Sequence, residues 1–221
     1  LIGVAKVMAA QKANWSGTLI LVGQPAEEAY MGAKGMIDDG LYPKIPEPSE
    51  VFASQTNQLW PAGSVGLGQG RRMAGADQMV VTLKGVGGHG STPHASKDPI
   101  VMSAQAILAY QTIISRRIDQ TEPVVLTVGA INSGTVGNII PDSATMRLSL
   151  RWYNPDARDQ MVAMVKQTTD AIAVGNGMPA DRMPVYENIQ SITSVTNDDE
   201  LVLAMRPVLA QALGKENVYP G

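Results

Sequence analysis

The chain has 221 residues, of which 44% are hydrophobic and 17% charged, which is enough for one large domain or two modest ones with a substantial core. Its formal net charge is −3 and it has no run of Lys or Arg, so a nucleic-acid-binding surface is not expected. The lack of cysteine excludes disulfides and thiolate metal ligands within these residues, and no apolar stretch approaches the roughly 18 residues of a membrane-spanning helix. We therefore expect neither nucleic acid nor a membrane as a partner.

The part of the chain before about Arg72 has the composition of an α/β domain. Its predicted elements are, in chain order, a helix over 1–12, a strand over 18–22, a helix over 31–40 and a short strand over 51–53. The segment 55–70 is rich in Gly, Pro and polar residues, which predicts a loop. Because the chain opens with Leu1 inside a predicted helix and closes at Gly221 without a stop signal, we expect further sequence at both ends, and the cellular location stays open.

The pattern changes after Arg72. The next predicted elements are a strand over 78–84, a helix over 98–118, strands over 124–132 and 144–153, a helix over 155–174 and a strand over 185–192. This β-α-β-β-α-β order is that of a split βαβ, ferredoxin-like unit. We therefore predict a domain over 75–190 inserted into a domain formed by 1–74 and 191–221. The outer domain resumes with a helix over 198–213.

Two adjacent carboxylates, Glu27 and Glu28, follow the predicted strand over 18–22. The apolar residues of that strand predict that it is buried, and Gly23 and Pro25 end it. Acidic side chains just beyond the carboxyl end of an interior strand stand where α/β folds bind ligands. Like charges repel, so a nearby cation or a shared proton best explains the pair. One carboxylate would then ligate a metal and the other act as a base on bound water; the alternative is a solvated pair in the first turn of a helix.

Both histidines of the chain, His89 and His94, lie in the glycine-rich segment 85–94. Glycine lets a backbone approach closely, and imidazole donates a hydrogen bond near neutral pH, so this segment suits a site. The alternative is a pair of ordinary exposed loop histidines.

Asn138 and Arg151 are further candidates for binding. Asn138 has glycine and proline neighbours, so a turn role is its alternative. Arg151 ends an alternating strand, and its planar guanidinium can hold a carboxylate; an edge-strand arginine with a solvated head is the alternative. The carboxylates of Asp77, Asp98 and Asp142 are predicted to serve turns and helix caps, with Asp98 as the N-cap of the helix over 98–118.

Five short segments carry a resemblance to a known family. In chain order they are Gly-Gln-Pro-Ala-Glu-Glu, Gly-Val-Gly-Gly-His-Gly-Ser-Thr-Pro-His, Lys-Asp-Pro-Ile-Val, Val-Gly-Ala-Ile-Asn-Ser-Gly and Asn-Ile-Ile-Pro-Asp. Together they resemble the zinc-dependent aminoacylase/carboxypeptidase family, in its branch of hippurate hydrolases, N-acyl-amino-acid amidohydrolases and auxin-conjugate hydrolases. The resemblance covers nearly the whole chain.

The resemblance implies a fold, a reaction and partners. The fold is a partial zinc-peptidase-type α/β catalytic domain with an inserted β-α-β-β-α-β lid or dimerisation domain. The reaction is metal-dependent hydrolysis of the amide bond of N-acyl amino acids or related amides. The full-length parent would hold two divalent metal ions, zinc first, with manganese, cobalt or nickel as alternatives. It would form a homodimer through the lid domain.

The resemblance also implies roles for single residues. Glu27 matches the general base and Glu28 a metal ligand. His89 matches the lid histidine that polarises the scissile carbonyl, often in the site of the partner subunit. Asn138 and Arg151 match positions near the carboxylate of the substrate.

The metal ligands are where this sequence departs from the family pattern. A His/Cys-rich motif would precede Leu1, and a last histidine would lie beyond Gly221. A further histidine position is occupied here by Gln55, with Gln58 as the alternative alignment, and glutamine is a poor zinc ligand. We therefore expect that this polypeptide by itself holds no stable two-metal site and does not turn over substrate.

Two rival functions remain open from the sequence. One is a catalytically inactive homologue that binds a ligand or a partner through the lid domain, which Gln55 favours and the intact Glu27 and His89 oppose. The other is an aminopeptidase or dipeptidase of the same fold. An intact His/Cys-rich motif before Leu1 would favour the enzyme over the inactive homologue, and a degenerate one the reverse. The residues that bind the ends of the substrate would separate an aminopeptidase or dipeptidase from an amidohydrolase.

Overall fold

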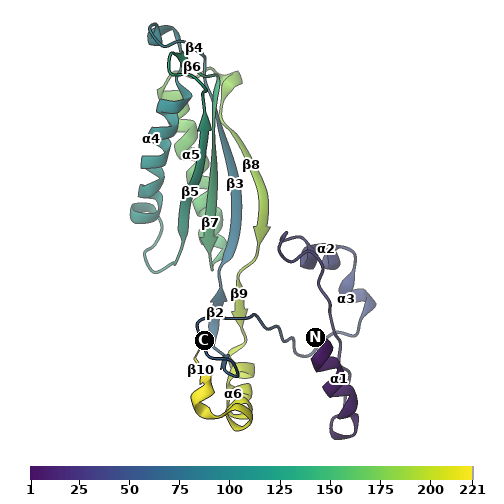
Figure 1. The fold of residues 1–221 in the computed structure, drawn as a ribbon. Coiled ribbons are helices and arrows are strands. Elements are labelled where there is room, and N and C mark those ends of the chain that lie inside the picture. Colours follow the sequence, from purple (N-terminus) through teal and green to yellow (C-terminus); the bar gives the residue numbers. More distant parts are fainter. Residues whose placement is uncertain (221) are drawn as a thin grey trace. The chain divides into compact units, whose positions relative to one another are not determined.

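A computed structural model describes residues 1–220, and the chain divides into two compact units, Leu1–Leu59 and the part from Trp60 onward. The first unit is sparsely structured (Figure 1). Its elements are α1 (Ile2–Ala10), the 3-10 turn η1 (Lys12–Asn14), α2 (Gly32–Asp38) and α3 (Leu41–Lys44). The helices predicted over 1–12 and 31–40 are thus confirmed, with their ends shortened.

The strands predicted over 18–22 and 51–53 are wrong, because neither segment pairs with another strand in the described residues. A strand is stable only when its backbone groups pair with a neighbouring chain, and the residues described in the first unit supply none. The expected burial fails for the same reason: Leu19 and Leu21 are 42% and 43% exposed. The apolar pattern is that of an interior strand, but the sheet that would cover it is not formed by these residues.

In the second unit, a four-stranded antiparallel sheet with the order β5-β7-β3-β8 carries two helices on one face (Figure 1). The strands are β3 (Gly75–Lys84), β5 (Val125–Ser133), β7 (Ser143–Trp152) and β8 (Val185–Ile192). The helices are α4 (Pro99–Thr112), which continues into the π-helical turn η3 (Ile113–Arg117), and α5 (Pro155–Gly175). The chain order confirms the predicted β-α-β-β-α-β pattern.

The core lies between this sheet and its helices. Side chains alternate along a strand, so Met146, Leu148 and Leu150 of β7 are buried in the core while Arg147 and Arg151 face the open side. The helix contribution to the same core includes Met102, Ala106, Tyr110, Met161 and Val165. Burial of this apolar face is the main stabilising term of the unit.

Both helices begin where the sequence predicts. Asp98 accepts hydrogen bonds from the backbone nitrogens of Ile100 and Val101 at 2.8 and 3.4 Å, as an N-cap does. Asn154 caps α5 in the same way, with 3.0 Å between its Oδ1 and the nitrogen of Asp156.

The segments on either side of the sheet domain pair with each other. The strand β1 (Val65–Gly66) pairs with β10 (Val218–Tyr219), and β2 (Gly70–Met73) pairs with β9 (Val195–Asn197), next to α6 (Asp199–Leu213). Such pairing is what an inserted domain requires. The predicted boundaries at 75 and 190 stay a prediction, while the sheet itself spans Gly75–Ile192.

The remaining elements are short. They are β4 (Gly88–His89), η2 (Pro93–Ala95), β6 (Ile139–Ile140), η4 (Ala180–Arg182) and η5 (Lys215–Asn217). None of the helices found within residues 1–220 has the length and apolarity needed to cross a membrane.

Candidate functional site

Glu27 and Glu28 lie in a turn over residues 27–30, just before α2, and both side chains are exposed. The turn is closed by the Tyr30 nitrogen, which donates to the Glu27 carbonyl at 2.9 Å. Ala26 and Tyr30 have φ angles of 49° and 56°, a left-handed conformation that residues other than glycine seldom adopt. Strained backbone of this kind clusters at functional sites, and the role of the two carboxylates stays a prediction.

A close approach at Gly32 holds this turn in place. A Cβ added to Gly32 would lie 1.5 Å from the carbonyl oxygen of Pro25, so no side chain fits there. Gly32 is buried, at the start of α2. The two ends of the segment from Pro25 to Gly32 thus lie against each other.

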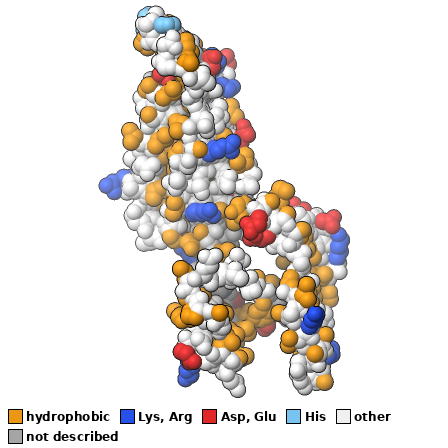
Figure 2. Space-filling model, viewed as in Figure 1, with side chains coloured by type: hydrophobic (Ala, Val, Ile, Leu, Met, Phe, Trp, Pro, Cys, Tyr) orange, Lys and Arg blue, Asp and Glu red, His pale blue; other side chains and the backbone are white. Residues whose placement is uncertain are grey.

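His89 and Asn138 lie side by side at the outer end of the sheet domain. In the β4–β6 pair His89 is opposite Ile139, and the nitrogen of the next residue, Gly90, donates to the Asn138 carbonyl at 2.8 Å. Both side chains are exposed, and Figure 2 shows histidine at this end of the sheet domain. The structure therefore brings these two predicted residues together.

Asp142 ties the loop that carries His89 to the turn between β6 and β7. Its Oδ1 accepts a hydrogen bond from the Gly87 nitrogen at 3.0 Å, and its carbonyl accepts one from the Gly85 nitrogen at 2.7 Å. The turn role predicted for Asp142 is confirmed. The glycine-rich loop is thus held by backbone donors at several points.

Arg151 lies at the opposite end of the sheet from His89. In the β3–β7 pairing, Ser143 is opposite Lys84 at the His89 end, and Arg151 is opposite Ala76. Eight residues of strand separate Ser143 from Arg151, about 26 Å at roughly 3.3 Å per residue. Arg151 is exposed on the open face of β7, an inner strand of the sheet and not an edge strand. One subunit therefore does not bring Arg151 and His89 to the same small ligand.

The residues that could hold a metal do not gather into a cluster. Within residues 1–220, no group of three or more His, Cys, Asp or Glu side chains is placed to hold a metal ion. Gln55 and Gln58 are exposed in an unpaired segment of the first unit, and both histidines belong to the second unit. The donor set that this chain supplies does not fit a complete two-metal centre.

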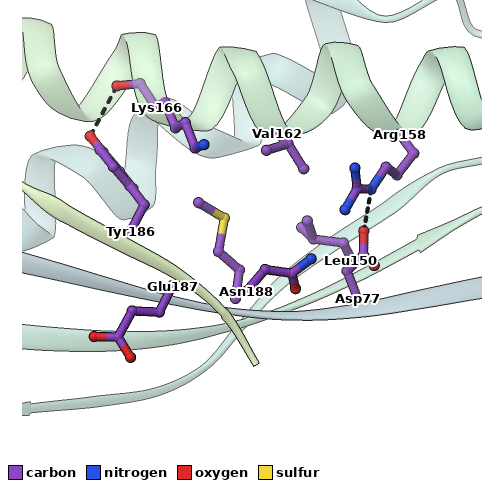
Figure 3. A pocket seen from close by; sticks show the side chains of 9 residues that line it. Asp77, Leu150, Arg158, Val162, Lys166, Tyr186, Glu187 and Asn188 are labelled. Carbon is purple, nitrogen blue, oxygen red and sulfur yellow. Dashed lines mark hydrogen bonds and ion pairs between the residues drawn. The ribbon is translucent and has the colours of Figure 1, made fainter. Parts of the chain in front are cut away.

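A pocket between α5 and the β3–β8 side of the sheet contains none of the predicted site residues (Figure 3). Its volume is about 50 Å³, and Met79, Leu150 and Val162 form its apolar lining. At one end Asp77, which is 1% exposed, accepts a hydrogen bond from Arg158 Nε at 2.5 Å. That hydrogen bond raises the pKa of Arg158.

The other end of the pocket is occupied by Tyr186, whose hydroxyl donates to Asp170 Oδ1 at 2.6 Å. Burial raises the pKa of Tyr186, and the acceptor carboxylate raises it further, so the hydroxyl keeps its proton. Asp77 and Tyr186, at the two ends of the pocket, thus pair with Arg158 and Asp170 of α5, and these contacts hold α5 on the sheet.

The turn role predicted for Asp77 is therefore wrong. Asp77 lies inside β3, on the face that also carries Met79, Val81 and Leu83. In the sequence, Asp77 and these apolar residues occupy every second position, and this alternation is the signal that Asp77 is buried. Nothing in the sequence identifies Arg158 as its partner, because that contact spans 81 residues.

Comparisons with known proteins agree with this fold. Residues 72–176 match the profile of the M20 peptidase dimerisation domain. Hippurate hydrolase of Campylobacter jejuni is 34% identical over 98% of this chain, and N-acetylcysteine deacetylase of Bacillus subtilis is 30% identical over 99%. The chain covers 55% and 56% of these two proteins, so it spans about half the length of the curated relatives it matches.

Two solved structures extend the comparison. A dinuclear metal-binding peptidase of the M20 family from Bacillus subtilis is 25% identical with a TM-score of 0.73, covering 96% of this chain and 51% of that one. A structure from methicillin-resistant Staphylococcus aureus is also 25% identical, with a TM-score of 0.83 over 95% of this chain and 54% of that one.

The fold and these matches define the chain as an α/β protein with the fold of M20 peptidase structures. Residues 72–176 belong to the peptidase dimerisation-domain family of the M20 peptidases, and a solved M20 peptidase structure matches 96% of this chain. The family expected from the five sequence segments is confirmed.

We predict that Gly88→Ala loosens the His89 loop. A Cβ on Gly88 would lie 2.2 Å from Oγ of the buried Ser96, and such overpacking costs about 1–3 kcal/mol. Hydrogen exchange of the amides from Gly85 to Gly90 should accelerate. Gly137→Ala is the control, since a Cβ there meets nothing within 4 Å; equal exchange in both variants would contradict the proposed packing.

We also predict that Arg158→Ala destabilises the sheet domain by about 3 kcal/mol, because it leaves the buried Asp77 carboxylate uncompensated. Urea denaturation followed by fluorescence measures the change. Asp159→Ala removes the other, 69% exposed partner of the same guanidinium and should cost less than about 1 kcal/mol. Similar losses in the two variants would refute the special role of the buried pair.

Proposed function

We propose that this chain is part of a hydrolase that cleaves the amide bond of N-acyl amino acids or related conjugates. The observation that carries the proposal is the exposed Glu27–Glu28 pair in a turn that begins with the left-handed Ala26. Relatives named hippurate hydrolase and N-acetylcysteine deacetylase support an amide substrate. Because the chain spans about half the length of these relatives, the activity is assigned to a longer protein that contains it.

In this proposal Glu27 takes a proton from the attacking water and passes it to the leaving amine, acting first as a base and then as an acid. The tetrahedral intermediate carries a negative oxygen that needs a donor, and the imidazole of His89 supplies one. Asn138, held beside His89, offers its amide to the same ligand. Arg151 pairs its guanidinium with the carboxylate of the substrate.

Glu28 is proposed as a ligand of a centre of two divalent metal ions, with zinc first and manganese, cobalt or nickel as alternatives. A metal ion in such a centre lowers the pKa of the water that it binds. The description of a solved relative as a dinuclear metal-binding peptidase supports divalent metals in general. The described part of this chain gathers no set of three ligands, so the other ligands would come from the rest of the longer protein.

The separation of Arg151 from His89 supports a homodimer with shared sites. A distance of about 26 Å along the strand is too long for one amino-acid-sized substrate to touch both side chains of one subunit. In an isologous dimer, each subunit can lend its His89 to the site of the other. The match of residues 72–176 to a dimerisation domain agrees with this arrangement.

The outer edge of β5 is the proposed dimer interface. This edge pairs with no other strand within residues 1–220, and unpaired backbone groups are a template for a second strand. Val125 and Ile131 of β5 are 51% and 46% exposed, and Leu108 on the adjacent helix α4 is 73% exposed. Hydrophobic side chains are visible on the flank that carries α4 in Figure 2.

A homologue that binds a ligand or partner without turnover is the second candidate. Gln55, at a position where the family resemblance implies a histidine ligand, favours it. The carboxylate turn and the hydrogen-bonded His89 loop favour the enzyme. Amide hydrolysis by the longer protein separates the two.

We predict that Glu27→Gln in the full-length protein lowers kcat for N-acyl amino acid hydrolysis by about 10²- to 10⁴-fold, the usual contribution of a general base. KM should change little, because glutamine keeps the size of the side chain. Glu47→Gln, at another exposed glutamate of the first unit, is the control and should retain activity. Unchanged activity of Glu27→Gln would remove this residue from the mechanism.

We predict that the chain of 221 residues does not bind two zinc ions tightly, because its described residues form no cluster of ligands. Isothermal titration with zinc measures this. The Glu28→Gln variant should behave like the unmodified chain. Tight binding of two zinc ions that is lost in Glu28→Gln would show that the chain alone completes the centre.

We predict that Val125→Lys combined with Ile131→Lys shifts the protein from dimer to monomer, because charges on an edge strand oppose strand pairing. Sedimentation equilibrium measures the dissociation constant. Ile189→Lys is the matched control, since Ile189 is 45% exposed on the other edge strand, β8. A dimer that survives the β5 changes and is lost in Ile189→Lys would place the interface on β8.

A further inference from the structure

Ser91 faces the imidazole of His89 with two hydrogen-bonding groups. The two residues share a tight turn, which the Thr92 nitrogen closes by donating to the His89 carbonyl at 2.9 Å. The backbone nitrogen of Ser91 lies 3.2 Å from His89 Nδ1, and Ser91 Oγ lies 2.7 Å from the same atom. Both groups thus converge on one ring nitrogen.

The backbone amide decides which nitrogen of the neutral ring carries the proton. A neutral imidazole has one N–H donor and one acceptor nitrogen. The amide of Ser91 can only donate, so Nδ1 must accept, and the proton lies on Nε2. In the other tautomer an N–H on Nδ1 could donate to Ser91 Oγ, but it would also face the backbone N–H of Ser91, which would lose its acceptor.

The hydroxyl of Ser91 adds a second constraint. With Nδ1 as an acceptor, Oγ–H donates to it, and this short contact fixes the rotation of the ring about its side-chain bonds. The backbone under the ring is itself held, because Gly90 donates to the Asn138 carbonyl and Asp142 accepts from Gly87. The exposed Nε2 is thereby presented in one direction.

We infer that Ser91 is a positioning residue that holds His89 as the Nε2–H tautomer and aims this N–H at the carbonyl oxygen of the substrate. The purpose assigned to the N–H rests on the proposed function. The tautomer and its cause rest only on the geometry of the turn. An experiment can therefore refute the purpose of the N–H without refuting the tautomer, or the reverse.

Nuclear magnetic resonance of histidine-labelled protein tests the inference, because the chain has only two histidines. Long-range ¹H–¹⁵N spectra of the 221-residue chain at about pH 9, well above the ordinary histidine pKa of about 6.5, distinguish protonated from lone-pair ring nitrogens. We expect His89 to show a lone pair on Nδ1 and a proton on Nε2. His94, assigned by its loss in His94→Gln, should show the averaged mixture of a free ring.

Ser91→Ala and Ser91→Thr test the role of the hydroxyl. Ser91→Ala keeps the backbone donor, so Nε2–H should remain the main tautomer, while the Nδ1 resonance shifts toward that of a nitrogen without a hydroxyl donor. Ser91→Thr restores the hydroxyl and should restore the resonance. Backbone amide spectra verify that Ser91→Ala keeps its fold.

Two results would overturn the inference: the same tautomer mixture for His89 and His94, or an Nδ1 resonance that Ser91→Ala leaves unchanged. Neither readout depends on catalysis. Loss of the proposed amidohydrolase function with a fixed His89 tautomer would refute the function and leave the positioning role of Ser91 intact.

Discussion

The pairing of β3 with β7 is the constraint on which the rest of the dimerisation domain depends. It runs without a register shift from Gly75 opposite Trp152 to Lys84 opposite Ser143. A slip of one residue would turn the apolar face of one strand toward solvent, so burial of that face fixes the register. The same register determines where each end of the sheet lies, and with it the positions of the His89 loop and of Arg151.

The elements of this domain could be predicted from the sequence because they contain their own signals. Alternating apolar residues mark β3 and β7, and Asp98 and Asn154 cap the helices that the sequence places after them. Each such signal spans only a few residues. The His89 loop could also be found, since it holds the only two histidines of the chain among glycines.

The other features could not be predicted because they depend on contacts between distant residues. The apolar run at 18–22 has the pattern of a strand, but pairing requires a neighbour that residues 1–59 do not supply. Asp77 needs Arg158 from another element to be stable in the core. The large separation of Arg151 from His89 follows from strand direction, and the spacing of these residues in the sequence gives no sign of it.

The ribbon formed by β2 and β9 leads directly into the long strand β3 of the dimerisation domain. It is two strands wide, only a few residues long and irregular, with a register shift between Arg71 and Met73. From its end, the ten residues of β3 carry the chain about 33 Å toward His89. By simple geometry, a rotation of about 10° at the ribbon displaces the imidazole by about 6 Å at this length of strand. A small change in this short backbone segment would therefore move the imidazole by several ångströms without any change in the hydrogen bonds within its loop.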